Sequence, residues 1–446
     1  MLVHRNCLLS GKERREDDDE IEGSREGIAA VAALLMAVGG LVVPTSASAE
    51  TSPPAGHVRT PQTWYLYAGA GETVSTDFTK VFQVLNGQMD PTVVITRPDG
   101  SVASECALTA ADPVGSQCAF TEVAAGDGVW SVALVAPEGQ ETAQGRQVLD
   151  WDISVYDGGE PRPGRVWTER YAQYDLPLQP APLGGPVDLT LWYLTEQGYI
   201  YEVDRLGMQG IDSIYTADAF GVVDPATCAS AHSSTAGRGY QKISNTTCRY
   251  TPFKMFFAAP ADDLPAQVTL PTGETTWLST PPVTPTLDAV TFTQDTVGSR
   301  SGTIEAVFSN FEGSALVHVD ADGDGAFDGP NERTTTMGIV GGEGSVVFDG
   351  LDAVGNPIPY TTPVAFRVSA DGFAEVHFSD QDTEVLGNGI QVRRLNGPAD
   401  GTETRIFWDD THVTSAMNDP QADLKCSATA PLASGVAGVD SAGGVH

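Results

Sequence analysis

Lysine is scarce in this 446-residue chain, which contains it only at positions 12, 80, 242, 254 and 425. Lysine and arginine together number 24 against 59 acidic residues, so the formal net charge at pH 7 is −35. A chain this acidic is repelled by the phosphates of nucleic acids and by anionic lipid headgroups. We therefore expect neither as a partner, and we expect the chain to attract cations.

Sequence signatures of common hydrolase centres are also absent. None of the seven histidines lies in a His-Glu-x-x-His zinc motif, and no Gly-x-Ser-x-Gly turn precedes a helical pattern. His318 and His377 fall in strand patterns, where we interpret them as ordinary strand residues. A glycosidase needs two carboxylates that converge on one bond from separate strands, and the adjacency of the carboxylates at 262–263 and 409–410 does not indicate such convergence. We expect no catalysis, with an enzyme as the open alternative.

Long apolar runs are confined to one place, residues 28–43. Small residues up to Ala49 follow, and an apolar stretch ahead of an Ala-x-Ala sequence is typical of a cleavable secretory signal. We predict a signal peptide over residues 1–49, with an uncleaved membrane anchor as the alternative. The acidic residues at 16–20 fit a signal poorly, so either Arg25 supplies its positive charge or the true translation start lies further downstream.

No later run is long enough to cross a bilayer, so we expect no membrane insertion after signal cleavage. The expected location is therefore outside the cell, either secreted or at the cell wall or cell surface.

A sustained helical period is missing from the mature region, which contains short alternating segments instead. Residues 92–96 and 130–135 are examples, and Gly, Pro, Asp and Asn separate such segments. Alternation with a period of two is typical of half-buried strands. We predict an all-β fold made of tandem β-sandwiches. The clearest hairpin joins residues 188–194 to 199–203 through the turn 195–198.

Proline-rich breaks suggest the domain boundaries. Residues 161–164 close a first unit, and residues 281–285 form a semi-rigid linker before a third. The predicted organisation is a β-sandwich at 60–160, a second at 164–260, a third with a calcium loop at 286–411, and the start of a further, truncated region at 412–446.

Cysteines suit an exported chain, because disulfides persist outside the cytoplasm. Cys7 falls in the predicted signal, and local spacing pairs four of the others. The expected disulfides are Cys106–Cys118 and Cys228–Cys248. Other pairings of these four, and buried free thiols, stay open. Cys426 is left over, and we expect its partner to lie beyond residue 446 in a longer protein.

The acidic segment 320–332 (Asp-Ala-Asp-Gly-Asp-Gly-Ala-Phe-Asp-Gly-Pro-Asn-Glu) has the ligand spacing of a calcium loop. Calcium takes six to eight oxygen ligands, and alternate residues of a tight turn direct their oxygens to one centre. Gly325 permits the sharp bend. We therefore expect Ca²⁺ as a structural ion. The predicted ligands are the backbone carbonyl of Ala326 and the side chains of Asp320, Asp322, Asp324, Asp328, Asn331 and Glu332.

The end of this segment departs from the pattern. A bidentate glutamate is expected at position 12 of the loop, where Asn331 stands, and Glu332 follows one residue later. Either the turn at 329–330 bulges to bring Glu332 in, or Asn331 coordinates and the affinity falls. The preceding residues 315–319 alternate like a strand, not a helix. An acidic surface turn without an ion is the alternative interpretation.

A strand leading into Asp320-x-Asp322-x-Asp324-Gly325 resembles the calcium loops of bacterial surface-adhesin repeats. Residues 349–356 are similar to the Asp-Gly-x-Asp-x-x-Gly-Asn turn of bacterial Ig-like domains, and residues 64–156 resemble a small β-sandwich found beside secreted proteases. The resemblance implies Ig-like or jelly-roll-like sandwiches, surface display and adhesion by an actinobacterial protein. No sortase signal is visible in the chain.

Aromatic residues of the predicted hairpin suggest a binding surface. Trp192 lies on one arm and Tyr199 and Tyr201 on the other, where side chains on a shared face could stack on a sugar ring. The alternative is that they fill the sandwich core.

These features predict a secreted or cell-surface, calcium-stabilised binding or structural protein, adhesin-like and non-catalytic. Its expected partner is an extracellular protein or a glycan surface. The alternative is a non-catalytic accessory region of a secreted hydrolase, one that binds carbohydrate.

Overall fold

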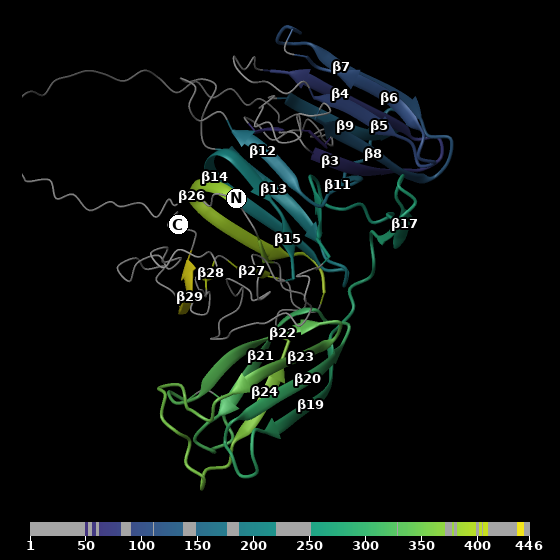
Figure 1. Ribbon diagram of the computed structural model, residues 1–446. Helices are drawn as coiled ribbons and strands as arrows, with labels where there is room; N and C mark the ends of the chain where they lie inside the picture. The colour runs from purple at the N-terminus through teal and green to yellow at the C-terminus, as the bar shows by residue number, and fades with distance from the viewer. Residues whose placement is uncertain are drawn as a thin grey trace, which may run out of the picture. The chain divides into compact units, whose positions relative to one another are not determined.

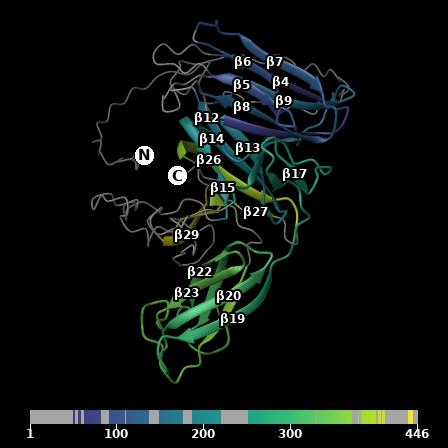
Figure 2. The ribbon, with the colours of Figure 1, turned by 45° about the vertical axis from the view of Figure 1, so that its right-hand side comes forward.

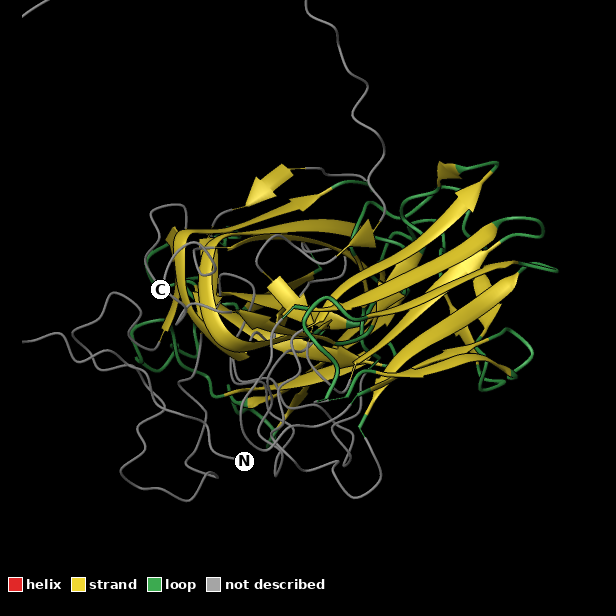
Figure 3. Cartoon of the chain, turned by 90° about the horizontal axis from the view of Figure 1, so that it is seen from above, coloured by secondary structure: helices red, strands yellow, loops and turns green. Residues whose placement is uncertain are grey.

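The computed structural model describes residues 50–51, 56–58, 62–81, 91–109, 111–136, 149–175, 187–219, 251–327, 329–370, 377–378, 381–397, 401–403, 405–408 and 435–440. All of them belong to one compact unit, Ala47–His446. Figure 3 shows strands and loops, and no helix, in this described part. The predicted all-β class is confirmed. Among the same residues, no helix is long and apolar enough to cross a membrane.

The strands as far as the long hairpin are β1 (Glu50–Thr51), β2 (Gly56–Val58), β3 (Gln62–Ala68), β4 (Thr73–Lys80), β5 (Thr92–Thr96), β6 (Val102–Ala107), β7 (Gln117–Val123), β8 (Gly128–Val135), β9 (Leu149–Asp157), β10 (Glu160–Pro161), β11 (Val166–Thr168), β12 (Tyr171–Asp175), β13 (Val187–Leu194) and β14 (Ile200–Tyr215). The later strands are β15 (Ala217–Asp218), β16 (Lys254–Phe256), β17 (Gln267–Thr269), β18 (Thr275–Trp277), β19 (Thr286–Gln294), β20 (Gly302–Ser309), β21 (Gly313–Asp320), β22 (Arg333–Val340), β23 (Glu343–Phe348), β24 (Ala365–Ser369), β25 (His377–Phe378), β26 (Gln381–Arg394), β27 (Gly401–Glu403), β28 (Arg405–Trp408) and β29 (Gly435–Asp440).

Strands β3 to β9 form two layers with a core between them (Figure 1). One layer has the order β6-β5-β8-β3 and the other β7-β4-β9. Alternation places Trp64 of β3 inside, where its ring centroid lies 5.7 Å from that of Phe78 and 5.2 Å from that of Trp151. The predicted strands 92–96 and 130–135 both lie in this core region.

The predicted disulfide Cys106–Cys118 is present, with its Cα atoms 5.9 Å apart. Cys106 belongs to β6 and Cys118 to β7, which are the outer strands of the two layers. In the described pairings β6 bonds to β5 and β7 to β4. The disulfide therefore links the two layers along one edge.

The hydrogen-bonded sheet continues past the predicted boundary at 161–164. β11 pairs with β3 and with β16, and pairing runs on through β13 and β14 to β26 and β27. β14 and β26 lie side by side in both views (Figures 1 and 2). One core contains Trp64 and Tyr193 from opposite sides of that boundary. Separate sandwiches at 60–160 and 164–260 are therefore not confirmed, since the two ranges share strands and core.

Residues 286–369 contribute six strands in the order β19-β20-β23-β22-β21-β24 (green in Figure 2). β22 and β23 pair only beside their turn, at Ile339↔Gly344 and Val340↔Glu343. Two halves of three strands thus enclose a core of their own, to which Ile304, Val317 and Met337 belong.

The predicted third unit at 286–411 contributes to more than this sheet. Its strand β26 pairs with β14, and its strand β28 pairs with β29 beyond the boundary at 412. The predicted signal peptide, the Cys228–Cys248 pair and Cys426 lie outside the described residues.

Candidate metal centre

The acidic segment forms the loop between two neighbouring antiparallel strands. β21 ends at Asp320 and β22 begins at Arg333, which pairs with Val319. On its other side β21 pairs with β24, where Ala365 lies opposite Asp320. Strand pairing therefore holds Asp320 at the base of the loop, and this residue is only 3% exposed.

Three carboxylates converge in this loop. One oxygen from each of Asp320, Asp322 and Asp324 lies within 4.8 Å of the others. The intervening Gly323 and Gly325 have φ angles of +79° and +86°, a region that glycine adopts without strain. Their amides donate to the two oxygens of Asp320, at 2.6 Å from Gly323 and 2.9 Å from Gly325. The turn thus winds around the buried Asp320 carboxylate.

The two exposed aspartates are held by amides further along the turn. Asp322 Oδ1 accepts a hydrogen bond from the Asp324 amide at 3.1 Å. Asp324 Oδ1 accepts one from the Ala326 amide at 2.8 Å. Because the backbone fixes both carboxylates, their convergence needs little further ordering of side chains.

Glu332, at the far end of the loop, lies beside this cluster. Both of its carboxylate oxygens accept from the Ala321 amide, at 3.3 and 3.1 Å. A Cβ added to Gly329 would lie 3.7 Å from both Glu332 Oε1 and Asp322 Oδ2, so these oxygens border the same space. Burial raises the pKa of Glu332, and the Asp322 and Asp320 carboxylates raise it further, against a lowering by the Ala321 amide.

The structure says less about the remaining predicted ligands, which are Ala326, Asp328 and Asn331. The Asn331 carbonyl accepts from the Ala353 amide at 3.1 Å, which ties the loop to the turn at 349–356. Asp328 lies outside the described residues. The roles of the Asn331 side chain and of the Ala326 carbonyl as ligands stay predictions.

The donor set consists of carboxylate oxygens. Asp320, Asp322, Asp324 and Glu332 offer hard ligands, which calcium prefers, whereas zinc is usually bound by imidazole and thiolate. The nearby His318 forms hydrogen bonds with residues of the two strands that flank β21, between Nδ1 and Thr334 Oγ1 at 3.2 Å and between Nε2 and Ser369 Oγ at 3.3 Å. The residues present therefore fit Ca²⁺.

The predicted aromatic surface is largely internal. Tyr199 is fully buried and Tyr201 is 7% exposed, and both belong to the main core. The Tyr199 hydroxyl donates to the Val283 carbonyl at 2.9 Å. Trp192 is only half-buried, and its indole nitrogen donates to Glu202 at 3.1 Å. Of the three residues, Trp192 alone retains appreciable exposed surface.

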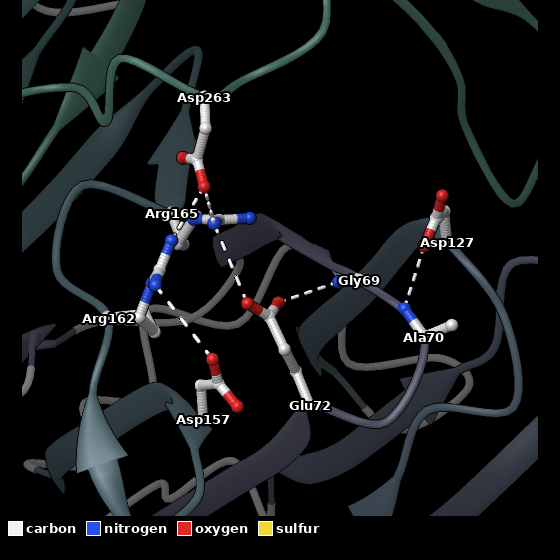
Figure 4. Close-up of polar contacts among 8 residues, drawn as sticks. All are labelled: Gly69, Ala70, Glu72, Asp127, Asp157, Arg162, Arg165 and Asp263. Carbon is white, nitrogen blue, oxygen red and sulfur yellow. Dashed lines mark hydrogen bonds and ion pairs between the residues drawn. The ribbon is translucent and has the colours of Figure 1, made fainter.

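A chain of ion pairs, which the sequence pattern did not indicate, lies where β11 begins (Figure 4). It runs from Asp157 through Arg162 and Asp263 to Arg165 and Glu72. The Arg165 side chain is 3% exposed. Because Arg162 and Arg165 flank the Pro-Gly pair of an apparent linker, local polarity gave no sign that one of them is buried.

Comparison with protein-family models, with curated proteins and with solved structures finds no match for this chain.

Proposed function

We propose that this chain is an exported, calcium-stabilised binding or structural protein of the secreted space or cell surface, adhesin-like and non-catalytic. The observation that carries the proposal is the convergence of Asp320, Asp322 and Asp324 within 4.8 Å at the end of a paired strand. Extracellular calcium is abundant enough to fill even a weak site of this kind.

Electrostatic repulsion supplies the reason for a cation. Two like charges 4 Å apart repel by about 1 kcal/mol in bulk water and by about 4 kcal/mol near a protein surface. Asp320 is buried, so the repulsion between its carboxylate and those of Asp322 and Asp324 is closer to the larger of these two energies. A divalent ion would turn this repulsion into attraction and would hold β21 and β22 together at their loop.

Two further features support export. The Cys106–Cys118 disulfide is stable in oxidising compartments. The apolar run at 28–43 ahead of Ala49 has the pattern of a secretory signal. Display at the surface and adhesion rest on the resemblance of the loop and of the turn at 349–356 to surface-protein repeats.

Carbohydrate binding by an accessory region of a secreted hydrolase is the second candidate. Trp192, Glu202 and Arg393 are cross-strand neighbours on β13, β14 and β26, and Arg393 donates to Glu202. An indole beside a carboxylate and a guanidinium is suited to a sugar. If Trp192→Ala binds every glycan on an array as the wild type does, this candidate is excluded at that residue.

Thermal unfolding in calcium and in chelator tests the first candidate. At calcium a hundredfold above the dissociation constant, the free energy of unfolding rises by about 2.7 kcal/mol, which for a chain of this length raises the unfolding midpoint by roughly 3 °C. The variant Asp322→Ala/Asp324→Ala should lose this shift. The control Asp262→Ala/Glu343→Ala removes two exposed carboxylates elsewhere and should keep it. No shift in the wild type would exclude the proposal.

A further inference from the structure

The side chain of Glu50 is captured by the fold. This residue opens β1 and is only 3% exposed. Its Oε1 atom accepts hydrogen bonds from three successive backbone amides: Gly164 at 2.6 Å, Arg165 at 3.0 Å and Val166 at 3.4 Å. Successive amides that point to one oxygen form a concave anion-binding nest.

The nest is built by residues other than those of β1. Gly164 has a φ of +76°, and a Cβ there would lie 2.1 Å from the Ala259 carbonyl oxygen, so only glycine fits. The Arg165 side chain is fixed by Asp263 at 2.6 Å and by Glu72 at 3.6 Å (Figure 4). Val166 pairs with Leu66 in β3. The three amides are therefore in place before a carboxylate arrives.

The backbone of β1 is bound at the same time. Glu50 pairs with Ile153 and Thr51 with Asp152 in β9. Backbone pairing and side-chain capture together fix the orientation of this short strand, which backbone bonds at two residues alone would hold weakly.

The position of Glu50 in the sequence connects its binding by the nest to the predicted cleavage of the signal peptide. Glu50 directly follows Ala49, the last residue of the predicted signal peptide. We propose that the nest at Gly164–Val166 is a carboxylate-binding site which captures Glu50 and so locks the amino end of the exported chain after signal cleavage. The capture itself stands on the contacts above, whereas its place in maturation rests on the proposed export.

The order of events follows from burial. A peptidase must bind the residues that flank the bond it cuts. Once Glu50 is buried and paired with β9, the residue on the carboxyl side of that bond is inaccessible. Cleavage after Ala49 therefore precedes capture, and capture then protects the new end.

Variants of the full chain test the nest. Glu50→Ala removes the acceptor of three buried amides and should lower the unfolding midpoint by about 5 °C. Glu50→Gln keeps a side-chain oxygen and should remain close to the wild type below pH 5. Acetate should raise the midpoint of Glu50→Ala more than that of the wild type, because it can enter the emptied nest.

Glu160→Ala is the matched control, since Glu160 is an exposed glutamate on β10, which also pairs with β9. If Glu50→Ala unfolds at the same midpoint as Glu160→Ala and acetate has no effect on it, the proposal that the Gly164–Val166 amides form a carboxylate-binding site is wrong.

Two measurements distinguish the binding of Glu50 by the nest from the proposed cleavage during export. Mass spectrometry of the exported protein should give Glu50 as the first residue; another start with an intact Glu50→Ala effect would overturn only the maturation step. The folded precursor should resist signal peptidase and become cleavable in urea. Equal cleavage in both conditions would overturn the proposed order.

Discussion

Replacement of Arg165 by methionine should destabilise the chain strongly. The Arg165 guanidinium lies 2.6 Å from Asp263 and 3.6 Å from Glu72, and stands over the Tyr67 ring at 5.5 Å from its centroid. Methionine fills similar volume without charge. The change therefore leaves both carboxylates without this partner, with little loss of packing.

Removal of the Arg165 guanidinium destabilises the Asp263 and Glu72 carboxylates by different amounts of free energy. Asp263 is 52% exposed and keeps Arg162 as a partner at 2.6 Å, so its loss is small. Glu72 is 12% exposed, and its other oxygen accepts from the Gly69 amide at 2.6 Å (Figure 4). Removal of one partner from a buried ion pair costs about 3–5 kcal/mol. Because the Gly69 amide still stabilises Glu72, we expect the lower end, about 3 kcal/mol.

A double-mutant cycle in urea, followed by tryptophan fluorescence, measures this coupling. Arg165→Met/Glu72→Gln should recover most of the loss, because no buried charge remains unpaired. The control Arg97→Met removes a pair with Glu122 in which the two side chains are 33% and 32% exposed, and should cost about 0.5 kcal/mol. If Arg165→Met costs no more than Arg97→Met, burial does not determine the strength of this pair.

Three further predictions concern pH, the disulfide and the loop. Burial raises the pKa of Glu50 from 4.5 to about 7, against a lowering by its backbone hydrogen bonds. The folded state therefore binds the proton more tightly than the unfolded state. The contribution of Glu50 to the free energy of unfolding is greatest below pH 4.5, falls by up to about 3 kcal/mol as the pH rises to 7, and then stays level. Glu50→Gln should abolish this fall in stability between pH 4.5 and 7, and an unchanged pH dependence of the melting temperature would contradict the prediction. Cys106→Ser/Cys118→Ser should lose about 3 kcal/mol in urea unfolding, since it frees β6 from β7; a loss below that of a surface substitution would show that the layers hold their edge without the bond. In the acidic loop, Gly323→Ala should destabilise more than Gly325→Ala, because its Cβ would lie 2.8 Å from Pro363 Cδ whereas the Cβ at Gly325 meets nothing within 4 Å; equal melting points would show that the loop adapts.

Local pattern predicted the strands well. β5 begins and ends at the predicted residues 92 and 96, and the hairpin of β13 and β14 has its turn at 195–198 as expected. These features depend on alternation and on turn residues, which are local properties. The extension of β14 to Tyr215 and its pairing with β26 depend on contacts between distant parts of the chain, and no short segment encodes them.

The same distinction applies to the candidate sites. The aspartates of the acidic loop are close in sequence, so their spacing was enough to predict that they converge. The Arg165 pairs and the capture of Glu50 join residues about a hundred positions apart, and only the fold brings them together. Tyr199 and Tyr201 show the limit of the hairpin pattern, which predicts the strands and does not tell whether a face is covered.

Calcium binding by the intact chain is the most direct test of the proposed function. Isothermal titration calorimetry should show one saturable calcium ion per chain at the acidic loop, and the Asp322→Asn/Asp324→Asn variant should lose it while retaining the fold. Binding of equal strength and stoichiometry in wild type and variant, or no saturable binding at millimolar calcium, would contradict the assignment of this loop as a calcium site.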